Sequence, residues 1–303
     1  MPHPDAMLDA NESVTADPGA AMAADIAYAK VNVALHVRAR RDDGYHALES
    51  LFVFAEDGDR LQGVATDDRA IDLVIDGPFG AMLDAGADNL VMRAARALQA
   101  YLGEQRGAAI RLTKHLPVAS GIGGGSADAA ATLRLLVRLW DVRIDDGELA
   151  ALALDLGSDV PACIASVTQM VKGRGERLAR HRVDGLEGCP MLLVNPGVAV
   201  STAQVFAGWD RVDRGPLDAD SLDALVSEGR NDLEAPARAA APAIGDVLAA
   251  LDGRDGLVLA RMSGSGATCF ALFRSAAALQ SAARAVRVAQ PGWWVMETRI
   301  RAA

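Results

Sequence analysis

The stretch GIGGGSADAA at residues 121–130 combines backbone freedom with the start of a helix, a pattern typical of anion binding. Its glycines let another group approach the backbone closely. From Ser126 to Trp140, apolar residues recur at helical spacing, with Ser126 in position to be the N-cap. A helix start presents unpaired N–H groups and a partial positive charge of about half a unit, and both attract phosphate. A flexible turn that feeds a helix is an equally good interpretation of the spacing alone.

Two familiar nucleotide-binding motifs are excluded at this loop. The dinucleotide fingerprint G-x-G-x-x-G fails because its sixth position, counted from Gly121, is Ser126. The P-loop motif needs a lysine directly after its glycines, and none follows here. The stretch would therefore be a phosphate-binding loop of a third kind.

Two charged residues could take part in proton transfer or charge stabilisation. Lys30, in AKVN, lies on a predicted strand and on the same face as Asn32. Asp159, in LGSDVP, lies near a predicted helix start, where a carboxylate could act as a general base. Each also has a plain structural interpretation. A lone lysine is usually a solvated surface charge, and Ser158 or Asp159 could simply cap a helix with Pro161 in its first turn.

Two further stretches carry weaker signals. In DDGYHALESLF (42–52), Tyr45 and His46 follow a turn and could be binding residues or an ordinary half-buried pair. SGSGAT (263–268) is either another loop of backbone donors or a turn. None of these stretches decides the function alone.

Composition limits the classes of function. The chain has 303 residues, of which 51% are hydrophobic, enough for two ordinary domains with a sizeable core. A net charge of −10 argues against general nucleic-acid binding, which needs a basic face, although a local electropositive cleft could still bind an anionic substrate. The three cysteines and five histidines lack disulfide or metal-ligand spacing, which predicts reduced thiols, a cytoplasmic protein and no zinc site.

The N-terminal region and the hydropathy pattern point away from membranes. No apolar run reaches the length of a membrane span, and the N-terminus lacks the basic region and apolar core of a secretory signal. Residues 1–24 are acidic, alanine-rich and contain prolines, which predicts a flexible extension.

Strand and helix patterns are interleaved without a regular βαβα alternation, which favours an α+β fold with a domain boundary near residues 175–190. The first half predicts strands at 26–37, 51–54, 71–76 and 109–117, and helices at 89–102, 126–140 and 146–156. The second half predicts strands at 191–196, within 261–273 and at 293–300, and helices near 221–229, 242–251 and 275–289.

Taken in order, AYAKVN, RRDDGYHALESLFVF, PVASGIGGGSADAA, LGSDVP and MSGSGATCF resemble the motifs of the GHMP family of small-molecule kinases. The similarity runs from about Ile26 to Phe273. The P-x-x-x-G-x-G-G-G-S loop marks the family. The other motifs are most similar to its branch in the non-mevalonate isoprenoid route, whose acceptor carries a cytidine diphosphate.

The resemblance implies a two-domain α+β fold with the active site in the inter-domain cleft. Residues 25–178 would form the ATP-binding N-terminal domain and residues 179–303 the C-terminal domain. ATP with Mg²⁺ would be the phosphoryl donor, although the sequence identifies no protein ligand for the metal. The partner would be a small-molecule acceptor rather than nucleic acid or a membrane, and a homodimer is among the expectations.

The resemblance also assigns roles to motif residues. Lys30 and Asp159 would be the catalytic pair. Asp159 would take the proton of the acceptor hydroxyl, while Lys30 would hold that aspartate ionised and offset charge on the transferring group. Tyr45 and Phe206 would sandwich the cytosine, and His46 would hydrogen-bond its edge.

The remaining positions would line the donor and acceptor sites. The ATP-binding set implied by the resemblance is Pro117, Val118, Ala119, Ser120, Gly121, Ile122, Gly123, Gly124, Gly125, Ser126 and Ala127, with Asn89 and Lys114 near the nucleoside. The acceptor set adds Asn32, Thr202, Ser263, Gly264, Ser265 and Gly266. Family members often have a second serine where this chain has Ala127, so a hydroxyl contact is lost there while the backbone cradle stays.

Two alternatives are left open. Another GHMP kinase, acting on mevalonate, homoserine or a sugar, would have little reason to carry Tyr45, His46 and Phe206. A nucleotide-binding protein without catalysis would have no need for both Lys30 and Asp159.

Overall fold

The computed structural model describes residues 22–302, and the structural statements below concern that part of the chain. Most of the extension expected over residues 1–24 lies outside the described residues. Residues 22–24 already belong to strand β1 (Met22–Arg40), because they pair with the far end of β2 (His46–Thr66). Cross-strand pairing therefore carries β1 beyond the point where apolar alternation begins in the sequence.

A six-stranded sheet, spanned by the long β1–β2 hairpin, forms the first half of the fold. Its order is β3-β4-β2-β5-β6, with β1 paired to β2. The strand predicted over 51–54 is far too short, because β2 pairs in turn with β1, β4 and β5. The other strands are β3 (Ile71–Asp76), β4 (Gly107–Thr113), β5 (Gln169–Gly173) and β6 (Arg177–Arg180).

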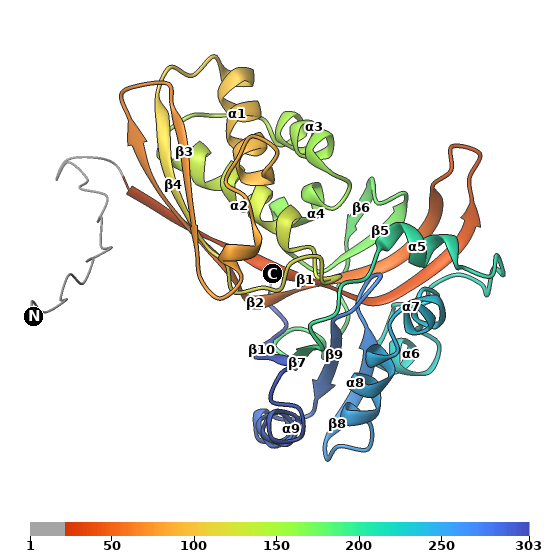
Figure 1. Cartoon of the computed structure of the whole chain (residues 1–303). Helices are drawn as coiled ribbons and strands as arrows, with labels where there is room; N and C mark the ends of the chain where they lie inside the picture. The colour runs from red at the N-terminus through yellow and green to blue at the C-terminus, as the bar shows by residue number, and fades with distance from the viewer. Residues whose placement is uncertain (1–21, 303) are drawn as a thin grey trace, which may run out of the picture.

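Helices pack on one face of this sheet and build the first core (Figure 1). They are α1 (Leu90–Leu102), α2 (Gly124–Leu139), α3 (Asp146–Leu156) and α4 (Val160–Ala165), with a short 3₁₀ turn, η1 (Gly80–Met82). As predicted, α1 ends at Leu102, and Gly103 follows as its C-cap with a φ of 62°. Trp140 closes the core, and its indole N–H donates to the Gly107 carbonyl at 3.0 Å.

A four-stranded antiparallel sheet of order β10-β7-β9-β8 organises the second half. Its strands are β7 (Pro190–Asn195), β8 (Leu257–Met262), β9 (Cys269–Phe273) and β10 (Trp294–Arg299). Its helices are α5 (Thr202–Ala207), α6 (Leu222–Ser227), α7 (Glu234–Ala240), α8 (Ala243–Leu251) and α9 (Ala276–Ala289). The predicted α+β class is confirmed.

The two sheets share a core on the face of the first sheet that the helices leave free. Val31 and Leu51 of the first sheet are fully buried in one cluster with Leu193, Phe270 and Leu272 of the second. Each such side chain contributes about 1.5–3 kcal/mol when fully buried. This shared core holds the two halves together at the edge of the cleft described below.

The change from the first sheet to the second falls between Arg180 and Pro190. The division expected after residue 178 would cut β6, which pairs with β5 of the first sheet. The end of β6 is therefore a better structural boundary than residue 178, and it lies inside the range of 175–190 that the sequence pattern indicates.

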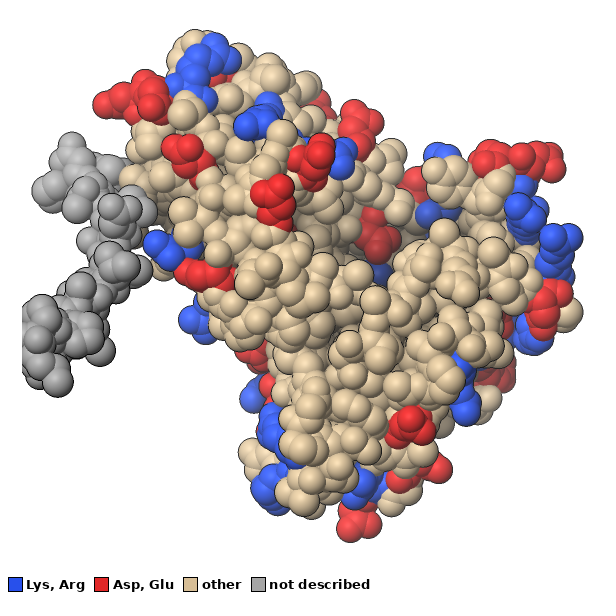
Figure 2. Space-filling view, in the orientation of Figure 1, with Lys and Arg blue, Asp and Glu red and all other residues tan. Residues whose placement is uncertain are grey.

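The surface and helices agree with the composition. On the face shown in Figure 2, acidic and basic side chains are interspersed. Among residues 22–302, no helix is both long and apolar enough to cross a membrane. Cys163, Cys189 and Cys269 are all buried as free thiols.

Candidate active site

A cavity of about 1180 Å³ lies between the two halves of the molecule. Its walls come from the β1–β2 hairpin, the loop before α2, the α3–α4 junction, the β5–β6 turn, α5 and the loop between β8 and β9. Figure 2 shows the surface hollowed between the two halves. The sequence-predicted site residues that line the cavity are Lys30, Asn32, Tyr45, His46, Ala119, Ser120, Gly121, Gly123, Gly124, Gly125, Ser126, Asp159, Thr202, Phe206, Gly264 and Ser265.

Helix α2 starts inside this cavity, but not at the predicted N-cap. Gly123, with a φ of 64°, is the N-cap, and Ser126 lies in the first turn. The prediction fails because a left-handed glycine lets the helix begin three residues earlier. The first helical bond runs from the Ala127 N–H to the Gly123 carbonyl, so the N–H groups of Gly124, Gly125 and Ser126 precede it. These donors face a cavity and make it suited to an anion.

Two of the loop glycines are required by close contacts. A Cβ on Gly121 would lie 2.6 Å from the Ser263 carbonyl oxygen, and a Cβ on Gly123 would lie 3.0 Å from Cε of Lys30. Both residues also have positive φ angles, which other residues rarely adopt. The glycines therefore let the loop pack directly on Lys30 and on the second glycine-rich loop.

The second glycine-rich loop, residues 263–268, packs against the first. The Ser263 hydroxyl donates to the Gly121 carbonyl at 3.0 Å, and the Thr268 N–H donates to the Ser120 carbonyl at 3.1 Å. The Ser265 and Thr202 hydroxyls are hydrogen-bonded at 2.9 Å, which joins the loop to α5. Two segments distant in the sequence thus form one wall of the cavity.

Lys30 and Asp159 meet in the cavity. The Lys30 Nζ lies 3.1 Å from Oδ2 of Asp159 and 4.3 Å from the ring centroid of Phe52. Lys30 is only 4% exposed, so it is not a solvated surface charge. Asp159 does occupy the N-cap position of α4, yet its side chain makes no capping hydrogen bond and turns to the lysine instead. The structure therefore brings the two predicted residues into an ion pair on the wall of the cavity.

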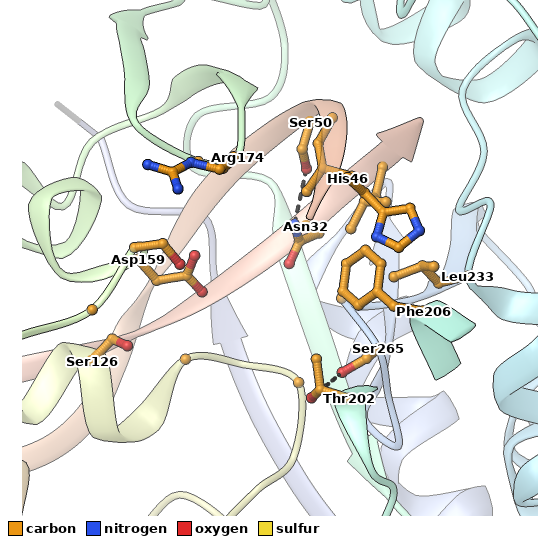
Figure 3. Close-up of a pocket in the computed structure, with 18 of the residues that line it drawn as sticks. Asn32, His46, Ser50, Ser126, Asp159, Arg174, Thr202, Phe206, Leu233 and Ser265 are labelled. Atoms are coloured by element: carbon orange, nitrogen blue, oxygen red, sulfur yellow. Dashed lines mark hydrogen bonds between the residues drawn. The ribbon is translucent and has the colours of Figure 1, made fainter. Parts of the chain in front are cut away.

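Asn32 is fixed by a hydrogen-bond chain whose directions are determined. Lys30 can only donate, so its bond at 2.9 Å identifies the Asn32 acceptor as Oδ1. The Asn32 Nδ2 then donates to Ser50 Oγ at 2.9 Å, and Ser50 donates to the Ala34 carbonyl at 2.6 Å (Figure 3). Register shifts in β1 flank both Lys30 and Asn32, as is common for bulges beside functional sites.

An aromatic cluster lies at the other end of the cavity. The His46 ring lies 5.0 Å from the Phe206 ring, tilted by 32°, and 5.7 Å from Trp209, nearly edge-on. Burial, and then the positive charge of Arg40, lowers the pKa of His46 below its usual 6.5. Tyr45 stands at the rim and is 60% exposed. The sequence missed Trp209, although an aromatic residue three positions after Phe206 was a usable signal.

Several predicted ATP and acceptor positions do not line the cavity. They are Asn89, Lys114, Pro117, Val118, Ile122, Ala127, Ser263 and Gly266. Ile122 and Ala127 are buried in the core, and Asn89 caps α1 by accepting from the Val91 N–H at 2.9 Å. The Pro117 carbonyl accepts from the Ser120 hydroxyl at 2.6 Å, and the Ser263 carbonyl accepts from the Gly266 N–H at 3.0 Å, so these residues contribute hydrogen bonds within the loops.

Lys114 is the clearest departure from the sequence-based assignment. Its Nζ lies 2.5 Å from Oδ2 of both Asp59 and Asp128, and all three side chains are almost completely buried. Asp59 also accepts from the N–H groups of His115 and Leu116. A Cβ on Gly124 would lie 3.1 Å from this ammonium, so the cluster sits beneath the first turn of α2. Two carboxylates therefore pair with this lysine, which was expected to lie near the nucleoside of ATP.

This cluster gives the protein an expected pH dependence. Burial raises the pKa of the Asp128 carboxyl from 3.8 to about 7, and its Oδ1 has no hydrogen-bond partner. Because the folded state then binds a proton more tightly than the unfolded chain, the Asp128 contribution to stability falls as the pH rises from 3.8 towards about 7. Asp128→Asn should flatten this fall in urea titrations at several pH values. An unchanged slope would contradict the assignment.

The sequence also missed several charged residues of the cavity. Arg40, Arg174 and Arg211 line it, and Glu176 lies on the same β5–β6 turn as Arg174. Within residues 22–302, no group of three or more histidine, cysteine, aspartate or glutamate side chains is placed to hold a metal ion. The KGRGE turn (172–176) was visible in the sequence, but nothing local indicated that it faced a cavity.

Comparisons with known proteins agree with this architecture. Residues 89–166 match the model for the GHMP kinases N terminal domain, and residues 217–290 match GHMP kinases C terminal. The chain is similar to a 4-diphosphocytidyl-2-C-methyl-D-erythritol kinase of Rhizorhabdus wittichii, with 54% identity covering 91% of this chain and 94% of the relative. A relative of the same name from Sphingopyxis alaskensis is 52% identical, covering 90% and 97%.

A solved structure supports the same comparison. A crystal structure of 4-(cytidine 5'-diphospho)-2C-methyl-D-erythritol kinase superposes with a TM-score of 0.77 at 32% identity, covering 91% of this chain and 99% of that one.

Proposed function

The chain belongs to the GHMP kinase family, and from this premise we propose that it phosphorylates the 2-hydroxyl of 4-diphosphocytidyl-2-C-methyl-D-erythritol with ATP. The reaction belongs to the non-mevalonate route to isoprenoid precursors. The observation that carries the proposal is a cavity with a phosphate-type loop, a Lys30–Asp159 pair and an aromatic end. Relatives that are about 50% identical over nine tenths of the chain carry the name of this kinase, which supports the identity of the acceptor.

The donor side of the proposal rests on the start of α2. The N–H groups of Gly124, Gly125 and Ser126 would bind the polyphosphate of ATP, aided by the positive end of the helix. When bound, Mg²⁺ supplies charge screening between the phosphates. Its protein ligands would be few, since Mg²⁺ at such sites is held largely by phosphates and water.

Asp159 is the general base in this mechanism. Its carboxylate accepts the proton of the acceptor hydroxyl as that oxygen attacks the γ-phosphorus of ATP, and the bond from that phosphorus to the bridging oxygen breaks so that ADP leaves. Lys30 orients the carboxylate through the 3.1 Å ion pair and offsets negative charge on the transferring group. Asn32 accepts a second hydrogen bond from the Lys30 ammonium and so helps to hold it in place. Phosphoryl transfer depends mainly on positioning and charge neutralisation, so this set is sufficient.

The aromatic cluster would hold the cytosine. A neutral imidazole donates through one nitrogen and accepts through the other, which matches a base edge that carries both an amine and a ring nitrogen. The lowered pKa of His46, caused first by burial, keeps that ring neutral near pH 7. Phe206, with Tyr45 at the rim, supplies faces for stacking.

The two alternative functions left open by the sequence have less support. Homoserine kinase from Cytophaga hutchinsonii superposes with a TM-score of 0.70 at 18% identity, covering 95% of this chain and 98% of that one, so the fold alone does not select the acceptor. The aromatic cluster argues against the small acceptors mevalonate, homoserine and sugar. The intact Lys30–Asp159 pair argues against a protein that binds nucleotide without catalysis.

The direct test is ADP release with Mg·ATP and four acceptors offered in parallel: diphosphocytidyl-methylerythritol, mevalonate, homoserine and galactose. Turnover with the cytidine compound alone is expected. Turnover with another acceptor would keep the kinase and discard the roles of Tyr45, His46 and Phe206. No ADP release with any of the four acceptors, while ATP still binds, would favour the non-catalytic alternative.

Phe206→Ala should raise the KM for the cytidine acceptor by about tenfold or more, because stacking on one base contributes about 1–3 kcal/mol. The KM for ATP should stay nearly constant, since Phe206 lies at the far end of the cavity from α2. Phe206→Tyr keeps the ring and serves as the control. Equal acceptor KM values in the alanine variant and the wild type would remove Phe206 from the stack.

Cellular location and assembly are also part of the proposal. We place the enzyme in the cytoplasm, where buried free thiols stay reduced and ATP is available. The homodimer stays a prediction, which sedimentation velocity of the purified full chain would test.

A further inference from the structure

Arg174 stands at the tip of the β5–β6 turn, inside the cavity wall. The turn is fixed at both sides: Gly173 and Gly175 have φ angles of 77° and 119°, and the Glu176 carboxylate accepts the Arg174 backbone N–H at 2.5 Å. The guanidinium itself makes no ion pair with a carboxylate in residues 22–302. A firmly held backbone therefore presents to the cavity a cation that no described carboxylate contacts directly, while Glu176 and Asp43 lie near enough to interact with its charge.

The contacts of this turn place Arg174 between the two ends of the cavity. Its guanidinium lies 5.2 Å from the ring centroid of Tyr45, at the aromatic end. The neighbouring Gly175 abuts the residue before the catalytic carboxylate, since a Cβ there would lie 3.5 Å from Cβ of Ser158. In the view of Figure 3, Asp159 lies between Arg174 and Ser126. Arg174 thus borders the path from the aromatic cluster to Asp159, on the opposite side of Asp159 from the start of α2.

We propose that Arg174 binds the diphosphate in the middle of the acceptor and so helps to select acceptors that carry one. The inference rests on the proposed function. With the base at the aromatic cluster and the reacting hydroxyl at Asp159, the diphosphate must cross the stretch of wall that Arg174 borders. Lys30 is already paired with Asp159, so it does not neutralise the negative charge of this diphosphate. The planar guanidinium matches phosphate oxygens in a two-pronged geometry.

Phosphate could also reach Arg174 from ATP, and the structure favours the acceptor. The donor phosphates have their own N–H groups at α2, in the part of the cavity that Ser126 marks. Arg174 instead stacks over Tyr45, a residue of the acceptor end. A cation at this position contributes most to the binding of a ligand that joins an aromatic base to phosphates.

The experiment is calorimetric titration of the full chain with cytidine, cytidine 5'-monophosphate, cytidine 5'-diphosphate and ADP. Arg174→Met should weaken binding of the diphosphate by about tenfold, with a smaller loss for the monophosphate and none for cytidine or ADP. Arg174→Lys should recover part of the loss, because it restores charge without the fork. Arg177→Met, an exposed arginine outside the cavity, is the matched control for net charge and should bind like the wild type.

Each other outcome has a defined meaning. Equal losses for cytidine and its diphosphate would overturn the inference, since Arg174 would then act only by packing on Tyr45. A loss confined to ADP would assign Arg174 to the donor and also overturn it. If the wild type binds ADP but none of the cytidine compounds, the proposed function fails first and this inference fails with it.

Discussion

Asp159→Asn is expected to lower kcat by about 10²- to 10⁴-fold, the usual contribution of a general base. The amide keeps the shape of the side chain but cannot accept the proton of the acceptor hydroxyl. The Kd of ATP should change little, because the donor N–H groups belong to α2. Single-turnover kinetics with the cytidine acceptor, together with equilibrium binding of ATP, separate the two effects.

The fold should survive this substitution. Asp159 is about a third exposed, so its ion pair contributes modestly to stability. Lys30 retains its hydrogen bond to Asn32 and its contact with the Phe52 ring. Asp155→Asn is a matched control, since Asp155 also lines the cavity but makes no ion pair with Lys30. A kcat near the wild-type value in Asp159→Asn, or equal losses in both variants, would remove Asp159 from the role of base.

Local sequence patterns foresaw the parts of the site that depend on neighbouring residues. Lys30 and Asn32 share a face because side chains alternate along a strand, and the structure joins them at 2.9 Å. The glycine-rich loop lies before a helix as predicted. Its close backbone contacts require residues without a Cβ, and this requirement is visible in the sequence as glycine. The predicted start of α2 was wrong, because Gly123 in the left-handed conformation is the N-cap instead of Ser126.

Patterns could not foresee interactions between distant segments. The sequence left Asp159 balanced between a helix cap and a base, and only the contact with Lys30, 129 positions earlier in the chain, separates the two. Trp209 and Arg174 belong to a short helix end and a tight turn, where propensity carries little information about what lies opposite. The length of β2 likewise follows from three pairing partners rather than from its own residues.

Lys114→Met is expected to lower the free energy of unfolding by about 3–5 kcal/mol, the usual cost of breaking a buried ion pair from one side. The substitution would leave Asp59 and Asp128, which are 0% and 4% exposed, without their shared cation. Methionine fills the space of the lysine chain, so the loss would come from charge rather than from a cavity. Urea unfolding of the purified variant at pH 7 measures the difference.

A second substitution separates this role from the one that the sequence predicts. Asp128→Asn added to Lys114→Met removes the carboxylate with no other hydrogen-bond partner, so the double variant should regain part of the lost stability. Asp59 keeps the N–H groups of His115 and Leu116 in either case. If Lys114 instead contacts ATP, Lys114→Met would leave stability nearly intact and raise the Kd of ATP, and Asp128→Asn would not restore binding. The two roles of Lys114 predict opposite results for stability and for ATP binding. One set of unfolding and binding curves therefore decides whether Lys114 supports the phosphate loop or contacts ATP directly.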